Sequence, residues 1–154
     1  MANPLQIRDC LCLHSRRTAR LVTQFYDDAL RPSGLRITQF LLLAAIQEAQ
    51  PIAHKPLADI LGMDRTTLTR NLAILDRDGL AVIAAGTDDK RESHTRLTAA
   101  GRQAVQRAMP YWQQAQQHLL DRLGSAPNAT NGAQALALLD RIGFLAASLE
   151  ESSH

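Results

Sequence analysis

The feature that most constrains the fold is the segment from Leu57 to Leu72, where two short helical patterns meet at a glycine. The first pattern ends at Leu61, Gly62 supplies the turn, and the second pattern begins after Asp64. Two helices joined in this way form a helix-turn-helix. Because Asp accepts a backbone hydrogen bond well at a helix start, we expect Asp64 to begin the second helix. The first two turns of that helix hold the residues that a recognition helix would present to a DNA groove, namely Arg65, Thr66, Thr67, Thr69 and Arg70.

The length and composition are those of one globular domain. A chain of 154 residues buries about 70% of its unfolded surface, enough for a core without disulfides or metals. Its longest apolar run, residues 40–46, is far shorter than the roughly 20 residues that span a bilayer. Residues 1–4 lack the basic segment and apolar core of a secretion signal. We therefore expect a single domain, residues 1–154, in the cytoplasm and not in a membrane.

Bulk charge does not indicate a nucleic-acid partner. Seventeen Lys and Arg against 15 Asp and Glu leave a formal charge of +2, and residues 54–96 hold seven basic and seven acidic side chains. Affinity for phosphate would therefore depend on where the charges are placed.

Helical periodicity precedes the helix-turn-helix. Apolar residues three or four apart predict one long helix from about Ile7 to Leu30. A second helix, from about Thr38 to Ala49, is apolar almost all round and should be buried. Pro56 suits the first turn of the short helix that ends at Leu61.

Beyond Gly79 the pattern changes to that of a small β-hairpin, or wing. Residues 80–83 and 94–97 predict two strands, and the polar residues 86–93 predict its tip. A long helix from Thr98 to about Leu123 follows, in which Pro110 is expected to mark a kink or a break. Residues 124–132 predict a loop, and the last helix runs from about Ala133 to Leu149.

The terminal helices carry broad apolar stripes that the compact middle of the chain does not need. In the last helix the stripe contains Leu138, Ile142, Leu145 and Leu149. We therefore interpret residues 36–98 as the DNA-binding part, and residues 5–34 and 99–154 as dimerisation helices. The fold class is mostly α: a winged helix-turn-helix with a small β-hairpin wing and long N- and C-terminal dimerisation helices.

This order of elements resembles the MarR family of bacterial transcription regulators over nearly the whole chain. The most specific motifs are Asp89 and Arg91 in the wing, the Leu-Thr-x-x-Gly-Arg stretch from Leu97 to Arg102, and Thr38-Gln39-Phe40 at the start of the second helix. The resemblance implies a homodimer whose fourth helix enters the major groove. It also implies a wing that reaches the minor groove through Arg91, oriented by Asp89 and assisted by Lys90. An Arg in a narrow minor groove reads DNA shape rather than base identity.

The two cysteines, Cys10 and Cys12, leave two interpretations open. Both fall near the start of the first helix, and residues two apart on one helix point about 200° apart, so the two thiols cannot easily bridge to each other. A disulfide across the dimer is geometrically possible, which would make the protein a thiol-based redox-sensing repressor. Buried packing of reduced thiols is the ordinary alternative in the cytosol.

Family members often bind small aromatic acids between the dimerisation helices and the DNA-binding part. The aromatic residues best placed for such a pocket are Phe25, Tyr26, Tyr111 and Trp112, which could equally be core residues. The effector would be a small aromatic molecule.

The sequence gives no support for an enzyme, a cofactor or a metal site. It contains no phosphate-binding Gly-rich loop and no dinucleotide motif, and Cys10 with His14 would supply only two metal ligands. We expect a sequence-specific regulator that binds a pseudo-palindromic double-stranded DNA operator as a ligand-responsive repressor. A winged-helix module that docks on proteins without binding DNA is the alternative from another class.

Overall fold

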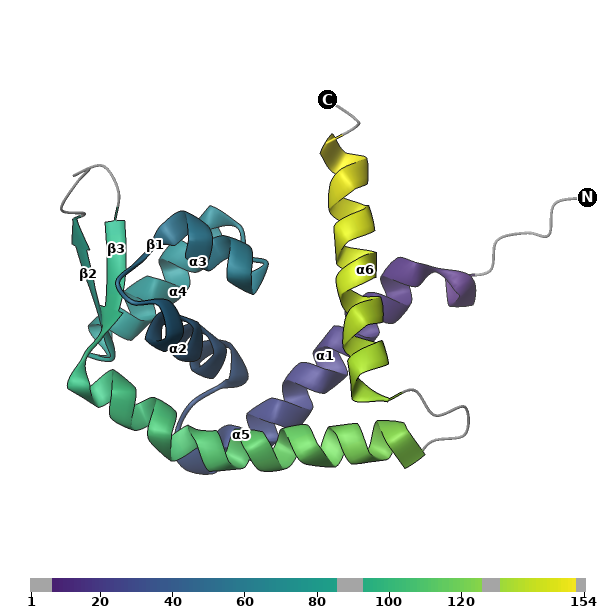
Figure 1. Ribbon diagram of the computed structural model, residues 1–154, viewed down its shortest axis with the longest axis horizontal. Coiled ribbons are helices and arrows are strands. Elements are labelled where there is room, and N and C mark those ends of the chain that lie inside the picture. Colours follow the sequence, from purple (N-terminus) through teal and green to yellow (C-terminus); the bar gives the residue numbers. More distant parts are fainter. Residues whose placement is uncertain (1–6, 86–92, 126–130, 152–154) are drawn as a thin grey trace, which may run out of the picture. The chain divides into compact units, whose positions relative to one another are not determined.

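The computed structural model describes residues 7–85, 93–125 and 131–151. The chain forms two compact units, residues 1–112 and 113–154, and one long helix continues from the first into the second. Figure 1 shows the elements, which follow one another as η1 (Ile7–Asp9), α1 (Leu11–Leu30), η2 (Arg31–Ser33), α2 (Ile37–Ala49), β1 (Ile52–Ala53), α3 (His54–Leu61), α4 (Arg65–Arg77), β2 (Ala81–Ala85), β3 (Ser93–Leu97), α5 (Ala99–Ser125) and α6 (Gly132–Glu151). The mostly helical winged helix-turn-helix expected from the sequence is confirmed.

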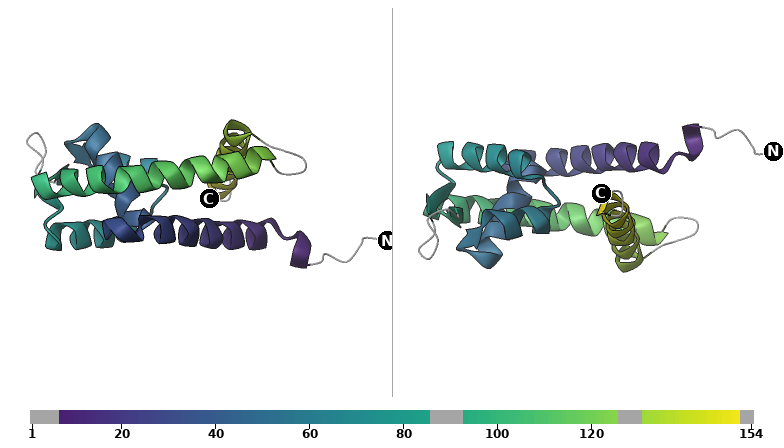
Figure 2. Two further views of the ribbon diagram at one scale, coloured as in Figure 1. Left: turned by 90° about the horizontal axis from the view of Figure 1, so that it is seen from below. Right: turned by 90° about the horizontal axis from the view of Figure 1, so that it is seen from above.

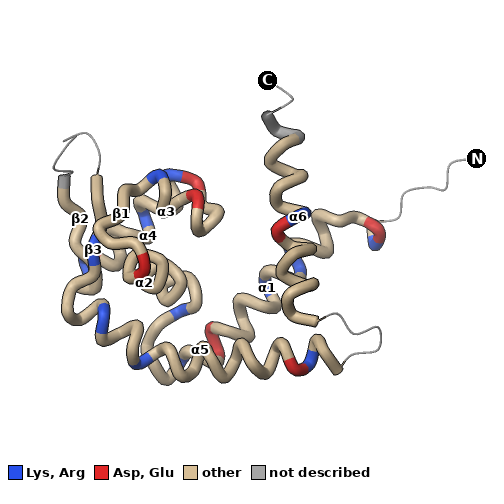
Figure 3. The backbone as a smooth tube through the Cα atoms, viewed as in Figure 1, with Lys and Arg blue, Asp and Glu red and all other residues tan. Residues whose placement is uncertain are grey.

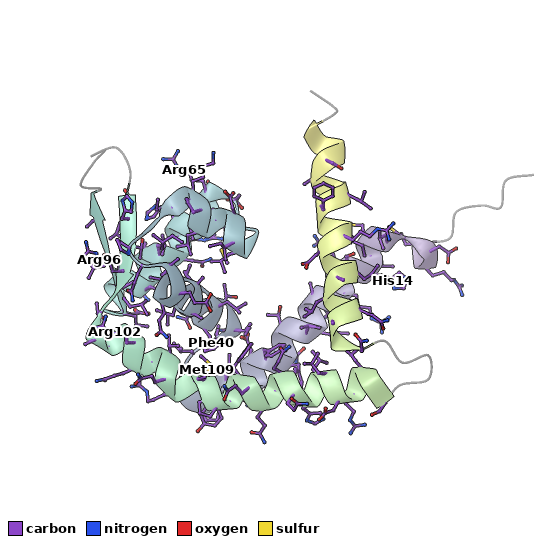
Figure 4. All side chains as sticks on the ribbon, in the orientation of Figure 1. His14, Phe40, Arg65, Arg96, Arg102 and Met109 are labelled. Atoms are coloured by element: carbon purple, nitrogen blue, oxygen red, sulfur yellow. The ribbon has the colours of Figure 1, made fainter. Side chains whose placement is uncertain are left out.

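The core of the first unit is built around α2. Six of its thirteen residues are buried, as expected for a helix that is apolar almost all round. Phe40 lies inside the unit (Figure 4) and packs against Trp112 of α5, with ring centroids 5.7 Å apart. The helix begins where Asp27 of α1 accepts a hydrogen bond from the Ile37 backbone N–H, at 2.7 Å. This bond ties the start of the buried helix to α1.

The helix-turn-helix consists of α3 and α4. Gly62 ends α3 with a left-handed backbone, φ 59°, which glycine adopts without steric strain. Its N–H and that of Met63 donate to carbonyl groups of the last turn of α3. Figure 2 shows α1 and α4 on one side of the first unit and α3 on the other.

The wing strands belong to a three-stranded antiparallel sheet in the order β1-β3-β2. Val82 pairs with Arg96. Ala85 pairs with Ser93, and this is the last pair toward the tip within the described residues. The short strand β1 was not predicted from the sequence. It has two residues and exists only because Ile52 and Ala53 pair with Thr95 and His94, a contact made by tertiary structure.

The start of α5 is packed tightly against the start of the wing. Thr98 donates from its backbone N–H to the Leu80 carbonyl, at 3.1 Å, and its hydroxyl oxygen accepts from the N–H of Gly101, at 3.0 Å. Thr98 therefore caps α5, which begins one residue later than predicted. Gly101 is buried directly under Leu80.

Four further predictions about the helices and the loop before α6 need correction. The predicted helix from Ile7 to Leu30 is divided at Cys10, whose backbone is extended (φ −77°, ψ 115°), so that η1 precedes α1. The break that was one of the two outcomes predicted at Pro110 is wrong, because Pro110 lies inside α5, whereas a kink there stays a prediction. The helix continues to Ser125 instead of stopping near Leu123. The predicted loop 124–132 is shorter, because Gly132 already belongs to α6, and its residues 126–130 lie outside the described part.

The second unit contains the end of α5 and α6. Gly132 lies so close to Leu120 that a Cβ atom there would be 2.3 Å from the Leu120 Cδ2 atom. Large apolar side chains of α6 remain exposed, including Leu139 at 59% and Phe144 at 73%. In the described ranges, no helix has the length and apolar character needed to cross a membrane.

Candidate nucleic-acid interface

The position of α4 is defined by Asp64, as the sequence predicted. One carboxylate oxygen of Asp64 accepts the Thr67 backbone N–H at 2.8 Å, and the other accepts the Thr67 hydroxyl at 2.6 Å. The Thr67 hydroxyl, and then its N–H, hold the pKa of Asp64 below its usual range. Thr67 was predicted to face DNA, but its hydroxyl is used in this cap.

The two faces of α4 differ as predicted. Leu68, Leu72 and Leu75 are buried in the first unit. The opposite face leaves Arg65, Thr66, Thr69 and Arg70 exposed. The Thr69 hydroxyl donates to the Arg65 carbonyl at 2.8 Å. The helix therefore presents cationic and hydroxyl side chains to solvent while its leucines anchor it.

The wing adds another exposed cation to Arg65 and Arg70 of α4. Arg96 lies on β3 with its side chain on the surface, and Figure 4 shows Arg65 and Arg96 pointing away from the core of the first unit. Arg96 is one of the seven basic residues in the range 54–96 but was not predicted to be a site residue. The predicted wing residues Asp89, Lys90 and Arg91 lie outside the described residues.

A groove opens where α3, the start of α4 and β3 meet. Its volume is about 430 Å³, and its lining includes His54, Lys55, Asp59, Arg65 and Ser93. Figure 3 shows both basic and acidic residues on this part of the backbone. This group was not predicted from the sequence, because His54 and Ser93 are 39 positions apart and meet only through the sheet.

His54 is held at the edge of this groove by the sheet. Its Nε2 atom lies 3.1 Å from the hydroxyl oxygen of Thr95, which is completely buried. Burial lowers the pKa of His54, and the nearby positive charge of Arg65 and the imidazole of His94 lower it further. These effects all favour the neutral form of the ring.

The cysteines are not arranged as the sequence analysis assumed. Cys10 is half-buried and precedes α1, whereas Cys12 is exposed within its first turn. Both are free thiols. Placing both cysteines on the first helix was therefore wrong: only Cys12 is helical, and helical geometry does not hold the two thiols apart.

The four aromatic residues predicted to line an effector pocket all belong to the first unit. Tyr26 is buried, which raises its pKa, and its ring meets that of Phe25 edge-on at 5.4 Å. Trp112 packs on Phe40, while Tyr111 is 38% exposed. A groove of about 740 Å³ in this unit is lined by none of the four but by charged residues such as Arg20, Asp27 and Arg31. The role of the four aromatic residues in ligand binding stays a prediction.

Within the ranges 7–85, 93–125 and 131–151, no three His, Cys, Asp or Glu side chains are grouped so that they could hold a metal ion.

Solved structures resemble this chain along almost its full length. The transcriptional regulator MosR of M. tuberculosis, solved in complex with DNA, is 40% identical, with a TM-score of 0.80 over 91% of this chain and 98% of that one. A mutant of MarR from E. coli, complexed with operator DNA, is 22% identical, with a TM-score of 0.71 over 88% of this chain and 92% of that one. The likeness to the E. coli protein, at 22% identity, shows that the two chains share a fold. The likeness to MosR, at 40% identity over almost the whole length, shows that the two chains belong to one family.

A curated relative supports the same class over a shorter stretch. The uncharacterized HTH-type transcriptional regulator YwoH of Bacillus subtilis (strain 168) is 29% identical over 82 residues. This match spans 53% of the present chain and 59% of the relative. No family model matches the chain.

Proposed function

Because the chain belongs to the MarR family of DNA-binding transcription regulators, we propose that it is a homodimeric repressor that binds a pseudo-palindromic operator and releases it on a small-molecule signal. The observation that carries the proposal is the exposed face of α4 on a helix-turn-helix, in a chain 40% identical to a regulator solved with DNA. Members of this family are regulators and not enzymes.

In this proposal α4 enters the major groove. Arg70 lies on the exposed face opposite Leu68 and Leu72, so its guanidinium can make a bidentate contact with a guanine edge. Thr66 and Thr69 flank it with methyl and hydroxyl groups. Arg65, at the first position of the helix, contacts a backbone phosphate instead, and Thr67 supports the cap.

The wing supplies the second contact. We assign Arg91 to the minor groove, with Asp89 to orient it and Lys90 to contact phosphate, because the family motif implies these roles. Arg96 adds an exposed cation on β3, one of the two strands of this hairpin.

The apolar faces of the terminal helices support dimerisation. Leu11 and Leu21 of α1 are exposed, and so are Leu138 and Leu145 of α6. Large exposed apolar patches on a single chain mark an interaction surface. A second copy that uses the same patches would bury them in a closed, two-fold interface.

Selection of bound sites from random duplex DNA tests this function directly. We expect enrichment of a pseudo-palindrome with half-sites about one helical turn apart, bound by two chains, with an affinity that falls as salt rises. Repeating the selection with small aromatic acids tests the effector and the set Phe25, Tyr26, Tyr111 and Trp112. No enrichment, and no salt-dependent binding to any duplex, would favour the protein-docking module instead.

A second candidate, thiol-based redox regulation, is favoured by one observation. Cys10 lies in extended backbone before α1, and Cys12 is exposed in the first turn of that helix. Because the two residues do not share a helix, helical geometry does not force their thiols to point apart. We expect an oxidant such as peroxide to weaken operator binding of the native chain and a reductant to restore it. Cys12→Ser should remove the response, whereas equal responses of both proteins would exclude a role for this thiol.

A further inference from the structure

The groove at the junction of α3, α4 and β3 has the composition of an anion site. Lys55 and Arg65 supply two cations, Ser93 supplies a hydroxyl, and Asp59 is the one carboxylate among the lining residues. His54 lies at the same groove and is the lining residue whose charge can change near neutral pH. These residues come from three elements that are brought together only by the fold.

We propose that this groove binds one backbone phosphate of the DNA and that His54 takes up a proton as the phosphate enters. The proposal rests on the proposed DNA-binding function and deepens it, because it adds His54 and Lys55, which lie outside the recognition face, to the phosphate contact of Arg65 and couples operator affinity to pH. The ligand is a phosphate diester, which carries a single negative charge.

Geometry places the groove where a phosphate would pass. Arg65 is the first residue of α4 and is exposed, so the groove adjoins the end of the helix that presents its side chains to DNA. Lys55 lies in the first turn of α3, the helix that crosses the DNA backbone in a helix-turn-helix. A phosphate between these two side chains would satisfy both cations.

The contact with Thr95 gives the protonated ring a defined arrangement. Thr95 is completely buried, so its hydroxyl is a fixed partner for the Nε2 atom of His54, 3.1 Å away. An imidazolium has an N–H on each nitrogen. When Nε2 donates to Thr95, the second N–H remains to donate to a phosphate oxygen.

The charges around the ring determine the direction of the pH effect. Among the described residues these are Lys55 and Asp59 on α3, Arg65 on α4 and the imidazole of His94 on β3. In the free protein, burial and then Arg65 and His94 lower the pKa of His54. A bound phosphate offsets the positive charge of Arg65 and favours the imidazolium, so the pKa rises on binding. By linkage, DNA affinity increases as pH falls.

The first experiment compares operator affinity across pH 6 to 8 at constant ionic strength, using the full-length protein and the selected operator. Uptake of one proton changes the affinity by at most about tenfold per pH unit for each protomer. We expect His54→Gln, which keeps a side chain able to bond Thr95, to lose most of this dependence. His118→Gln, which removes an exposed histidine of α5, is the matched control and should keep it. Equal slopes for the wild type and His54→Gln would overturn the proposal.

The second experiment locates the phosphate. Replacing single operator phosphates with neutral methylphosphonates should identify one position in each half-site where the substitution weakens wild-type binding but has little additional effect on His54→Gln. That non-additivity is the signature of a direct contact. Additive losses at every position would overturn the assignment.

A third measurement follows the His54 ring by NMR and separates the two sources of phosphate. We expect the titration of this ring to move to higher pH when the operator is added, and inorganic phosphate at matched ionic strength to leave it unchanged. Movement with inorganic phosphate alone would make the groove a free-phosphate site. If the protein bound no specific duplex at all, the proposed function itself would fail, which is a different result from pH-independent binding to a selected operator.

Discussion

The close contact between Gly101 and Leu80 makes Gly101→Ala the sharpest test of how the wing is positioned. A Cβ atom at residue 101 would lie 2.0 Å from the Leu80 carbonyl oxygen and 3.0 Å from its carbonyl carbon. Real Cβ atoms do not approach backbone that closely, so either α5 or the start of the wing must move. The same carbonyl accepts the N–H of Thr98 at 3.1 Å, and the movement would break this bond.

The expected sign is opposite to that of helix propensity. In a helix interior, Ala is favoured over Gly by about 1 kcal/mol. Overpacking commonly costs about 1–3 kcal/mol, and a backbone oxygen cannot rotate aside as a side chain can, so we take the upper end. The net loss is about 2 kcal/mol of unfolding free energy, or about 4–8 °C in melting temperature for a chain of this size. Operator affinity should fall as well, since β2 begins at the displaced turn.

Gly124→Ala is the matched control, because Gly124 belongs to the same helix, is exposed, and has nothing within 4 Å of an added Cβ atom. It should gain up to about 1 kcal/mol from propensity. Both variants are measured by thermal denaturation at one fixed protein concentration. A Gly101→Ala protein that melts at or above the wild-type temperature with unchanged operator affinity would refute the reasoning.

Four further predictions concern the interfaces and the cap. Arg70→Ala should weaken binding to the selected operator by about 1–3 kcal/mol and relax one position in each half-site; equal losses on random duplex would mean that it contacts only phosphate. Leu138→Glu combined with Leu145→Glu should convert the dimer to monomer in sedimentation, and an intact dimer would remove α6 from the interface. Asp64→Ala should melt below the wild type at neutral pH. Because hydrogen bonds from Thr67 lower the folded-state pKa of Asp64, its contribution is present above the unfolded-state pKa and is lost as pH falls through the folded-state value, so the two melting curves should converge in acid. Asp89→Lys should weaken operator binding at fixed salt although it adds positive charge; tighter binding would show that bulk charge outweighs the orientation of Arg91.

Local signals explain which parts of the interface were predictable. Asp64 was identified as a cap because capping depends on residues three apart, and its bonds to Thr67 are present. The buried and exposed faces of α4 followed from the spacing of its leucines, which helical geometry alone converts into a stripe. The helix break at Cys10 was missed because apolar residues continue in register across it, and the register does not reveal one extended residue.

The sequence by itself determined the helix-turn-helix, the amphipathic faces and the hairpin, because each is signalled by the types and spacing of residues within a short stretch of the chain. Tertiary structure alone decided what those elements bring together. It paired Ile52 and Ala53 with β3, placed Gly101 under Leu80, and set His54 beside Thr95, 41 residues away. Such contacts carry no periodic signal, since each depends on how whole elements pack and not on the spacing of residues within them.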